Sequence, residues 1–480
     1  MFKLLFLLMT IWSFSGVVLA TPAQSKSITL AEAVALAIRH NRTIESAYLN
    51  RILEKFDLEV VYDEFWPDLT ISATTTAMRQ ADNETIQGQI GANFALKVPT
   101  GGVLGLDITQ TIIEPWESPN NAFANDVVLS FRQPLLRGSG VDVNMASQLL
   151  AERQEQINRL NLTQTLIDTL TQVIYAYRNF LFARHSIEIT RLSLARSQQL
   201  LEVNRALIAA GRLAKVELIQ AEADLANQEL ALRENQNSLE QARLDLLQLL
   251  DIDKHTLIEP VEPIIVKPVN LNISTLQQIA LQRHPAYLQT LLEQENTQTR
   301  LLLAENEQLW ALDVIARYNI TGTSDDWFES QVRAGRLGEG DYSVQLALRI
   351  PFGDLPRERE LVAARVKLRH AGINVQELKD NIEIDLMDAV QNIQIKWEQV
   401  KLAQRFRDLS KQQLDIELEK LKAGRPGSNN FQIVSFQNNL IRAENSEIRA
   451  KIDYLNALTD LDALLGTTLE RWGVNISVTD

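Results

Sequence analysis

The sequence predicts a mainly helical protein that also carries membrane-type β-strands and is built from two copies of one unit. Three observations lead to this fold class. Segments recur in the same order in both halves, and long runs without proline or glycine keep a heptad spacing of apolar residues. Several segments of about ten residues alternate between an apolar and a polar face. With 480 residues, the chain is long enough for two or three ordinary domains.

The composition excludes several classes of function. The chain has no cysteine, which excludes disulfides, cysteine nucleophiles, cysteine–zinc sites and a lipidated N-terminal cysteine. Its 61 acidic residues against 47 basic ones give a net charge of −14, which argues against non-specific nucleic-acid binding. The five histidines are scattered, and the sequence contains neither a nucleophile elbow nor a phosphate-binding loop. We therefore expect no enzyme, no cofactor and no metal site.

Residues 1–20 have the pattern of a secretory signal peptide. Lys3 precedes a run of apolar residues, and Ala20 ends a small-residue cleavage site. An N-terminal membrane anchor is the less favoured alternative, because Ser13, Ser15 and Gly16 interrupt the apolar run. No later run reaches the roughly 18–20 residues that a spanning helix needs. The mature chain is therefore expected to be exported without a helical membrane span.

The two halves follow one plan. The segment Leu30–Arg42 recurs as Ile273–Pro285, and Ala210-Gly211-Arg212 recurs as Ala423-Gly424-Arg425. The predicted organisation is a signal peptide over 1–20, a first repeat over 21–258, a linker over 259–270, a second repeat over 271–470 and a tail over 471–480. Each repeat is expected to contain a helix, then strands (69–134 or 312–351), then a long helical hairpin (144–251 or 356–465).

The long helices have coiled-coil character. In the first rod the heptad stripe consists of Leu166, Val173, Phe180, Ile187, Leu194, Leu201 and Ile208, and in the second of Leu386, Ile393, Val400, Leu414 and Leu421. Ser139, Asp142 and Asn144 are candidate N-caps for the first rod, as Asp354 followed by Pro356 is for the second. Glycine at the Ala-Gly-Arg positions is expected to adopt a left-handed conformation where the rods reverse. A soluble four-helix bundle is the alternative.

The strands alternate cleanly, with four in the first half and two in the second. Ile90, Ala92 and Phe94, for example, alternate with Gly91, Asn93 and Ala95. A tight turn is expected at Pro99–Gly102, and longer surface loops over Glu114–Asn125 and Thr323–Asp341. Single segments of this kind also occur in soluble sandwiches. Tryptophans at the strand ends fit either an aromatic membrane belt or ordinary packing at hairpin ends: Trp66, Trp116, Trp310 and Trp327.

Together these segments resemble the TolC family of outer-membrane efflux channels over nearly the whole mature chain. The resemblance rests on the duplicated helix start, on Pro134-Leu135 and Pro351-Phe352 after a strand, and on the paired Ala-Gly tips. It implies a homotrimer whose strands form one shared outer-membrane β-barrel and whose long helices form a periplasmic tunnel. The tunnel tip would dock on a periplasmic adaptor and an inner-membrane pump. Independently, a few hairpins cannot close a barrel alone, and an open edge in lipid leaves backbone groups unpaired.

The chain departs from the family pattern in two places. Family members usually contribute two strands per half, so the extra hairpin of the first half either widens the barrel or lies outside it. Well-known members also carry two aspartates at the tip constriction, and the matching positions here are Gln432 and Ser435. Glu217 and Gln220 occupy the equivalent places in the first half, which makes Glu217 the main acidic lumen candidate. The alternative is that Glu217 is an ordinary carboxylate favoured by the helix dipole.

The tip region carries two further expectations. The resemblance implies that Gly211, Arg212, Leu213, Gly424 and Arg425 contact the adaptor, although such residues also serve simply to reverse the helices. Charged residues nearby, including Arg205 and Lys420, suggest ion pairs between the two hairpins that hold a closed state.

The sequence thus predicts a passive outer-membrane exit duct of a tripartite efflux or type I secretion system, which spans the Gram-negative periplasm and carries no lipid anchor. The alternative is a periplasmic coiled-coil structural or adaptor protein with a soluble β domain. Clusters of Met, His and Cys are missing, so metal export is disfavoured as the transport role.

Overall fold

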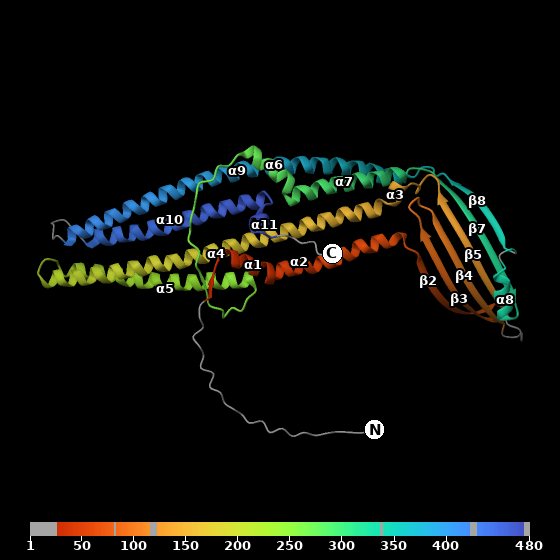
Figure 1. The fold of residues 1–480 in the computed structure, drawn as a ribbon, viewed down its shortest axis with the longest axis horizontal. Coiled ribbons are helices and arrows are strands. Elements are labelled where there is room, and N and C mark those ends of the chain that lie inside the picture. The colour runs from red at the N-terminus through yellow and green to blue at the C-terminus, as the bar shows by residue number, and fades with distance from the viewer. Residues whose placement is uncertain are drawn as a thin grey trace, which may run out of the picture. The chain divides into compact units, whose positions relative to one another are not determined.

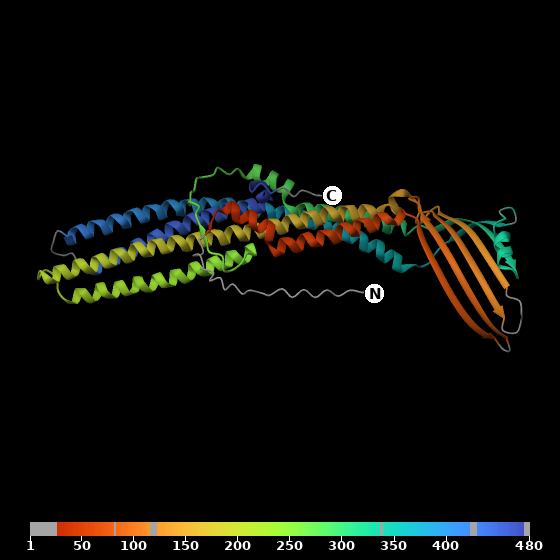
Figure 2. The same ribbon diagram turned by 60° about the horizontal axis from the view of Figure 1, so that its bottom comes forward.

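The computed structural model describes residues 26–80, 83–115, 122–336, 338, 340–422 and 430–474 (Figures 1 and 2). The predicted signal peptide lies outside these residues. The chain divides into two compact units. Unit 1 comprises Met1–Asn41, Gln172–Lys267 and Trp397–Tyr454, and unit 2 comprises Arg42–Thr171, Pro268–Lys396 and Leu455–Asp480. Three long helices, α4 (Ala146–Ala209), α9 (Leu355–Lys422) and α10 (Asn430–Leu464), contribute residues to both units.

Unit 1 is a helical bundle with a small parallel sheet. Besides its parts of α4, α9 and α10, it contains β1 (Lys26–Ile28), α1 (Leu30–His40), α5 (Val216–Leu250) and β6 (Ile258–Pro260). Helix α1 begins with a capping box, in which Thr29 and Glu32 satisfy each other's backbone N–H groups. Strands β1 and β6 pair in parallel, so the start of the described chain is tied to the segment after α5.

Unit 2 combines a large antiparallel sheet with shorter helices. The helices are α2 (Arg42–Tyr62), η1 (Asp63–Phe65), α3 (Val141–Asn144), α6 (Ile273–Arg283), α7 (Pro285–Asn306), α8 (Trp327–Ala334) and α11 (Thr468–Arg471). The strands are β2 (Asp68–Gln80), β3 (Asn83–Lys97), β4 (Val103–Pro115), β5 (Ala122–Pro134), β7 (Ala311–Ser324) and β8 (Asp341–Arg349). The six strands lie in the order β2-β3-β4-β5-β7-β8.

The duplicated architecture predicted from the sequence is confirmed. Helix α6 has the same bounds in the second repeat as α1 has in the first, and β7 begins at Ala311, the position equivalent to Asp68, which is the first residue of β2. The heptad stripes also pack as predicted, because Leu166, Val173 and Phe180 of α4 are buried. Leu386, Ile393 and Val400 of α9 are buried in the same way. Since these residues recur once every two turns, their burial gives each helix a continuous packed seam.

The extra hairpin of the first half belongs to the sheet. Strands β3 and β4 pair with each other, and they also pair with β2 and β5 on either side. The predicted tight turn between them is closed by hydrogen bonds from the Val98 N–H to the Gly102 carbonyl (2.8 Å) and from the Gly101 N–H to the Val98 carbonyl (2.9 Å). Gly101 has φ +90°, and a Cβ there would lie 2.2 Å from the Gly138 carbonyl oxygen, so this turn requires glycine.

Three local expectations need correction. The long loop expected over Thr323–Asp341 contains helix α8. The first rod lacks the predicted side-chain cap, because the short helix α3 precedes it. The N-cap residue of α3 is Gly140, which has no side chain that could cap the helix. The Asn144 amide donates instead to the Gly138 and Gly140 carbonyls. Trp327 lies in α8 rather than at a strand end, whereas Trp310 directly precedes β7 and Trp66 precedes β2 with Pro67 between them. Trp116 lies outside the described residues.

Within the described part of the chain, no helix combines the length and apolar character needed to cross a membrane.

Candidate functional site

The first hairpin tip, where α4 reverses into α5, is closed by a left-handed glycine. Gly211 has φ +68°, and the Arg212 N–H donates to the Leu207 carbonyl (2.9 Å), the pattern of a Schellman-type helix end. Gly211 and Arg212 are exposed and Leu213 is half-buried, so the reversal offers these residues to solvent in the isolated chain. The corresponding residues of the second tip, Gly424 and Arg425, lie outside the described residues.

The predicted pore residues come together at the helix starts that follow the two tips. The side chain of Asn430, which is fully buried, donates a hydrogen bond from its amide to the Glu217 carbonyl (3.4 Å) and so joins the starts of α5 and α10. Glu217 and Ser435 are half-buried, whereas Gln220 and Gln432 are exposed. The structure therefore brings the two repeats' candidate positions into one region, while their role in a pore stays a prediction.

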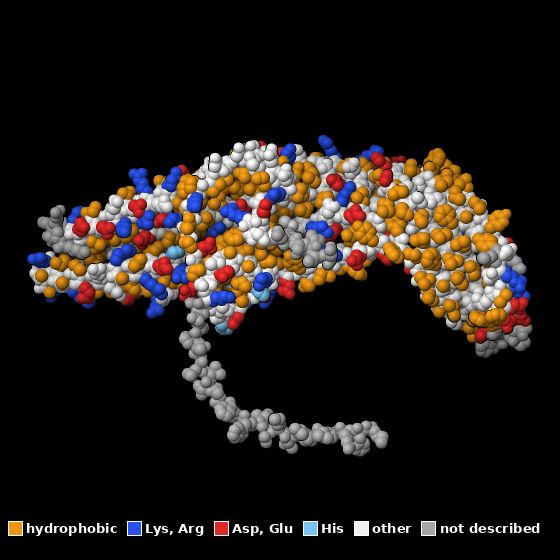
Figure 3. All heavy atoms as spheres, viewed as in Figure 1, with side chains coloured by type: hydrophobic (Ala, Val, Ile, Leu, Met, Phe, Trp, Pro, Cys, Tyr) orange, Lys and Arg blue, Asp and Glu red, His pale blue; other side chains and the backbone are white. Residues whose placement is uncertain are grey.

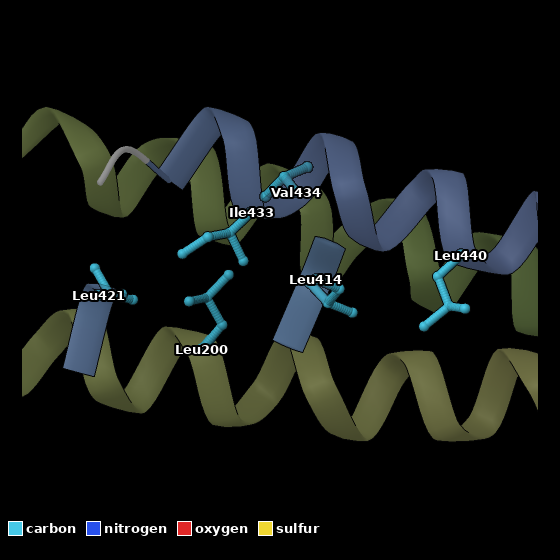
Figure 4. Packing of buried hydrophobic residues seen from close by; sticks show 6 residues of the cluster. All are labelled: Leu200, Leu414, Leu421, Ile433, Val434 and Leu440. Carbon is cyan, nitrogen blue, oxygen red and sulfur yellow. The ribbon is translucent and has the colours of Figure 1, made fainter. Parts of the chain in front are cut away.

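Beneath the tips lies a compact apolar layer (Figure 4). This tip cluster consists of Leu200, Leu414, Leu421, Ile433, Val434 and Leu440 from α4, α9 and α10. Ile433 is fully buried, although Phe431, two residues earlier on the same helix, is 64% exposed. Burying such side chains contributes about 1.5–3 kcal/mol each, so the cluster holds three helices together next to the tips.

A polar layer adjoins the tip cluster. The Gln437 amide donates to the Ser193 carbonyl (3.0 Å) and to the Ser197 hydroxyl (2.7 Å), and the Ser197 hydroxyl donates to the Asp224 carboxylate (2.6 Å). All four side chains are buried, and they come from α4, α5 and α10. Because a buried polar group is costly unless it is paired, this layer favours one register of the three helices. Sequence reasoning missed it, since single polar residues in a long helix give no periodic signal.

Charged residues in the same bundle form contacts both within and between helices. Arg196 lies 3.8 Å from Glu444, and Arg407 lies 3.4 Å from Glu447. Burial raises the pKa of Glu444 above its usual range, and the attraction of Arg196 and Arg407 opposes that shift only in part. Glu444 therefore takes up a proton more readily than an exposed glutamate does.

Arg205 and Lys420 were predicted to form ion pairs between the two hairpins. In the described residues they pair within their own hairpins instead. Arg205 pairs with Glu202 of its own helix (2.8 Å) and lies 3.9 Å from Glu222 of α5, within the same hairpin. Lys420 pairs with Glu417 of its own helix (3.0 Å). Contacts between the hairpins include the Asn430–Glu217 hydrogen bond, the buried polar layer and the Arg196–Glu444 pair.

The sheet of unit 2 has two chemically distinct faces. Rows of paired residues run across the strands, and one such row is Leu69, Phe94, Leu106, Leu129, Tyr318 and Tyr342. A row on the other face is Ser72, Gly91, Thr109, Asp126 and Thr321. We name these the apolar face and the polar face; Figure 3 shows hydrophobic side chains gathered over the strands. On the apolar face Leu69 is 62% exposed and Tyr342 84% exposed, which is unusual for a surface in contact with water.

The polar face is organised by hydrogen bonds between neighbouring strands. The Thr321 hydroxyl donates to the Asp126 carboxylate (2.6 Å), and Arg132 pairs with Asp313 (3.0 Å). The Asn93 amide donates to Asp107. Such a face suits water, while the opposite face suits hydrocarbon, which is the division that a membrane-spanning strand requires.

Comparisons with known proteins agree with this geometry. Residues 33–251 match the outer membrane efflux protein family. No curated protein sequence matches the chain. Among solved structures, the chain is similar to the outer membrane protein VceC of Vibrio cholerae, with TM-score 0.68, 14% identity, and coverage of 91% of this chain and 96% of that one.

Two further solved structures share the fold. The MtrE outer membrane channel of Neisseria gonorrhoeae in its open state has TM-score 0.67 and 14% identity, with 92% of this chain and 89% of that one covered. The Campylobacter jejuni CmeC outer membrane channel has TM-score 0.65 and 16% identity, with 96% and 94% covered. Residues 33–251 are thus similar to the outer membrane efflux protein family, and the chain as a whole has the fold of these solved outer-membrane channels.

Proposed function

We propose that three copies of this chain form an outer-membrane exit duct, through which substrates delivered by an inner-membrane pump leave the cell. The observation that carries this proposal is the six-stranded sheet, which has one apolar face, one polar face and two edges that pair with no other strand among the described residues. The alternative, a soluble β domain on a periplasmic coiled-coil protein, is disfavoured because such a domain covers its apolar face.

The two edges of the sheet suit pairing between copies. Every strand is antiparallel to its neighbours, so β2 and β8, at opposite edges of a sheet with an even number of strands, also run in opposite directions. The β8 edge of one copy therefore meets the β2 edge of the next as an antiparallel neighbour. Three copies of a six-stranded sheet would close a barrel of eighteen strands, a size that leaves a water-filled channel. Closure also satisfies the edge N–H and C=O groups, which lipid cannot do.

The polar face then lines the channel, and the apolar face contacts lipid. The extra hairpin β3-β4 widens this barrel beyond the one that two strands per half would give. The long hairpins of α4-α5 and α9-α10 would form the periplasmic part of the duct, and Gly211, Arg212 and Leu213 would meet a periplasmic adaptor.

The direct test is conductance in a planar lipid bilayer. The mature protein purified in detergent should insert and give discrete, long-lived conductance steps, because a closed barrel with a polar lining conducts ions. A mature protein that stays soluble without detergent and gives no steps would contradict the proposed function.

The same bilayers test the lumen candidate at the tip. Replacing Glu217 with glutamine should reduce the preference for cations over anions, because three copies of the carboxylate would otherwise attract cations at a constriction. Gln432→Ala is the matched control, since it changes the equivalent position of the other repeat without altering charge. The reversal potential in a salt gradient measures the effect, and equal values for both variants would remove Glu217 from the lumen.

A further inference from the structure

Helix α8 is placed at the end of the sheet farthest from the other helices of unit 2. It follows β7, whose opposite end joins α7, and it precedes β8, whose opposite end leads into α9 (Figures 1 and 2). Its start is fixed locally, because the Asp326 carboxylate accepts a hydrogen bond from the Glu329 N–H (2.9 Å). Under the proposed function, this end of the sheet is the extracellular rim of the barrel.

The helix packs directly on the sheet backbone at Gly322. A Cβ at this residue would lie 2.1 Å from the Ser330 carbonyl oxygen and 2.6 Å from the Ala334 nitrogen. Ser330 and Ala334 are correspondingly buried, at 0% and 3% exposure. Glycine in β7 thus permits a contact that any side chain would prevent. The helix is therefore part of the folded sheet rather than a free loop.

Hydrogen bonds fix which face of the sheet the helix covers. The Gln331 amide donates to the Gln110 side chain, and its side-chain oxygen accepts from the Asn125 amide. Gln110, Asn125 and Gly322 form one row across β4, β5 and β7. This row lies two residues along each strand from Ile108, Val127 and Ile320, a row of the apolar face. Because side chains alternate along a strand with period two, α8 lies on the apolar face.

The outer side of α8 presents large apolar residues away from the sheet. Trp327 is 52% exposed, Phe328 69% and Val332 43%. Arg333 and Glu329 flank them, paired at 2.6 Å, and the Arg333 guanidinium also donates to the Thr323 carbonyl (2.8 Å). A short helix with exposed aromatic residues and paired charges, seated on a lipid-facing surface at its end, has the properties of a membrane-interface element.

We propose that α8 is an interfacial anchor, which lies outside the barrel with Trp327 and Phe328 at the boundary between lipid headgroups and acyl chains. This inference rests on the proposed function for the assignment of the apolar face to lipid. The bilayer is the occupant that the structure favours, because α8 is seated on the apolar face and its own exposed side chains, Trp327, Phe328 and Val332, are apolar. A plug inside the channel would require α8 to lie on the polar face. The anchor fixes the depth of the barrel in the outer leaflet at a point where β5 and β7 are joined.

The absence of cysteine allows a site-specific test. In the full-length protein reconstituted into phosphatidylethanolamine–phosphatidylglycerol vesicles, Phe328→Cys is labelled with an environment-sensitive fluorophore. Quenching is then measured with lipids that carry a nitroxide at the headgroup or deep in the acyl chain. The label at residue 328 should be quenched more strongly by the headgroup nitroxide. Adding Gly322→Leu should abolish this quenching, because the new side chain displaces α8 from the sheet.

Two matched labels on β5 separate failure of the inference from failure of the proposed function. Leu129→Cys lies on the apolar face and should be quenched by the acyl-chain nitroxide, whereas Ser130→Cys lies on the polar face and should be quenched only by iodide in water. If the Leu129 label is not quenched by lipid, the proposed membrane face is wrong. If it is quenched but the residue 328 label responds only to iodide, or if unlabelled Phe328→Cys forms a disulfide between copies on oxidation, the anchor is wrong while the duct stands.

Discussion

Replacing Arg51 with alanine is expected to lower the free energy of unfolding by about 3–5 kcal/mol, because a buried carboxylate loses its main partner. The side chains of Arg51 and Glu155 are only 10% and 7% exposed, and the guanidinium binds both oxygens of Glu155. Arg51 also pairs with Glu54 at 2.7 Å. Exposed Arg359, 79% accessible and paired with Glu360, provides the control; its replacement with alanine should cost no more than about 1 kcal/mol.

The same pair makes stability depend on pH. Burial alone would raise the pKa of Glu155, but the hydrogen bonds from Arg51 and Arg159 outweigh it and hold the pKa below its ordinary value. A lowered pKa in the folded state means that the stabilisation is complete above the unfolded-state pKa and is lost as the pH falls toward the folded-state value. Urea unfolding followed by helical circular dichroism should therefore show an acid-dependent loss that Glu155→Gln reduces.

A double variant separates the two contributions of the pair. Replacing Arg51 with Met and Glu155 with Leu removes both charges and keeps apolar volume, so much of the stability lost in the single variant should return. A double variant that is less stable than Arg51→Ala would show that the charges themselves contribute net stability.

The second large effect is expected at the tip cluster. Ile433→Ala should destabilise the tip bundle by about 2–5 kcal/mol, because a fully buried side chain is replaced by a cavity between α4, α9 and α10. The matched control is Phe431→Ala on the same helix, whose side chain is 64% exposed and whose loss should change stability little. Limited proteolysis in the native state measures the effect, since cleavage near the tips reports local opening.

Loss of packing in the tip cluster is also expected to change how often the channel opens. If the tip cluster holds the bundle in one state, Ile433→Ala should also increase spontaneous opening events in the bilayer recordings, whereas Phe431→Ala should not. Equal cleavage rates for both variants would show that the tip is held by other contacts, such as the polar layer of Ser193, Ser197, Asp224 and Gln437.

Much of the fold could be predicted because its signals are local and repeated. The seven-residue spacing of apolar residues predicts the packed helices α4 and α9, and the capping residues Thr29 and Glu32 predict where α1 begins. The strands were recognisable from alternation alone. Their order was not, because pairing of β4 with β5, or of β5 with β7, joins segments whose pattern is equally apolar. The sequence therefore left the place of the extra hairpin open.

The candidate site was predictable in part. A glycine between two long helical segments predicts a left-handed backbone conformation at the helix end, and Gly211 has that conformation in the structure. Helix α8 was missed, although Asp326 and Glu329 form a recognisable helix start, because eight residues are too few for a periodic signal. The helix packs on the apolar face because Gly322 has no side chain, and this contact between α8 and β7 forms only in the folded sheet.

If the six-stranded sheet is one third of a shared barrel, as we propose, β8 of one copy lies beside β2 of the next, and cysteine cross-linking between these two strands detects that contact. Each variant carries two cysteines and is oxidised in the membrane. One is Ser72→Cys on β2, and the other is Ser343→Cys, Gln345→Cys or Ala347→Cys on β8. Disulfides form only where Cβ atoms lie about 3.5–4.5 Å apart. Thr109 of the interior strand β4, used in place of Ser72, is the control.

At least one of these β2–β8 pairs should give a ladder of covalent dimers and trimers with no larger species, while the β4 control stays monomeric. Failure of every pair to join separate chains, in protein that otherwise inserts into the membrane, would contradict a barrel shared between copies.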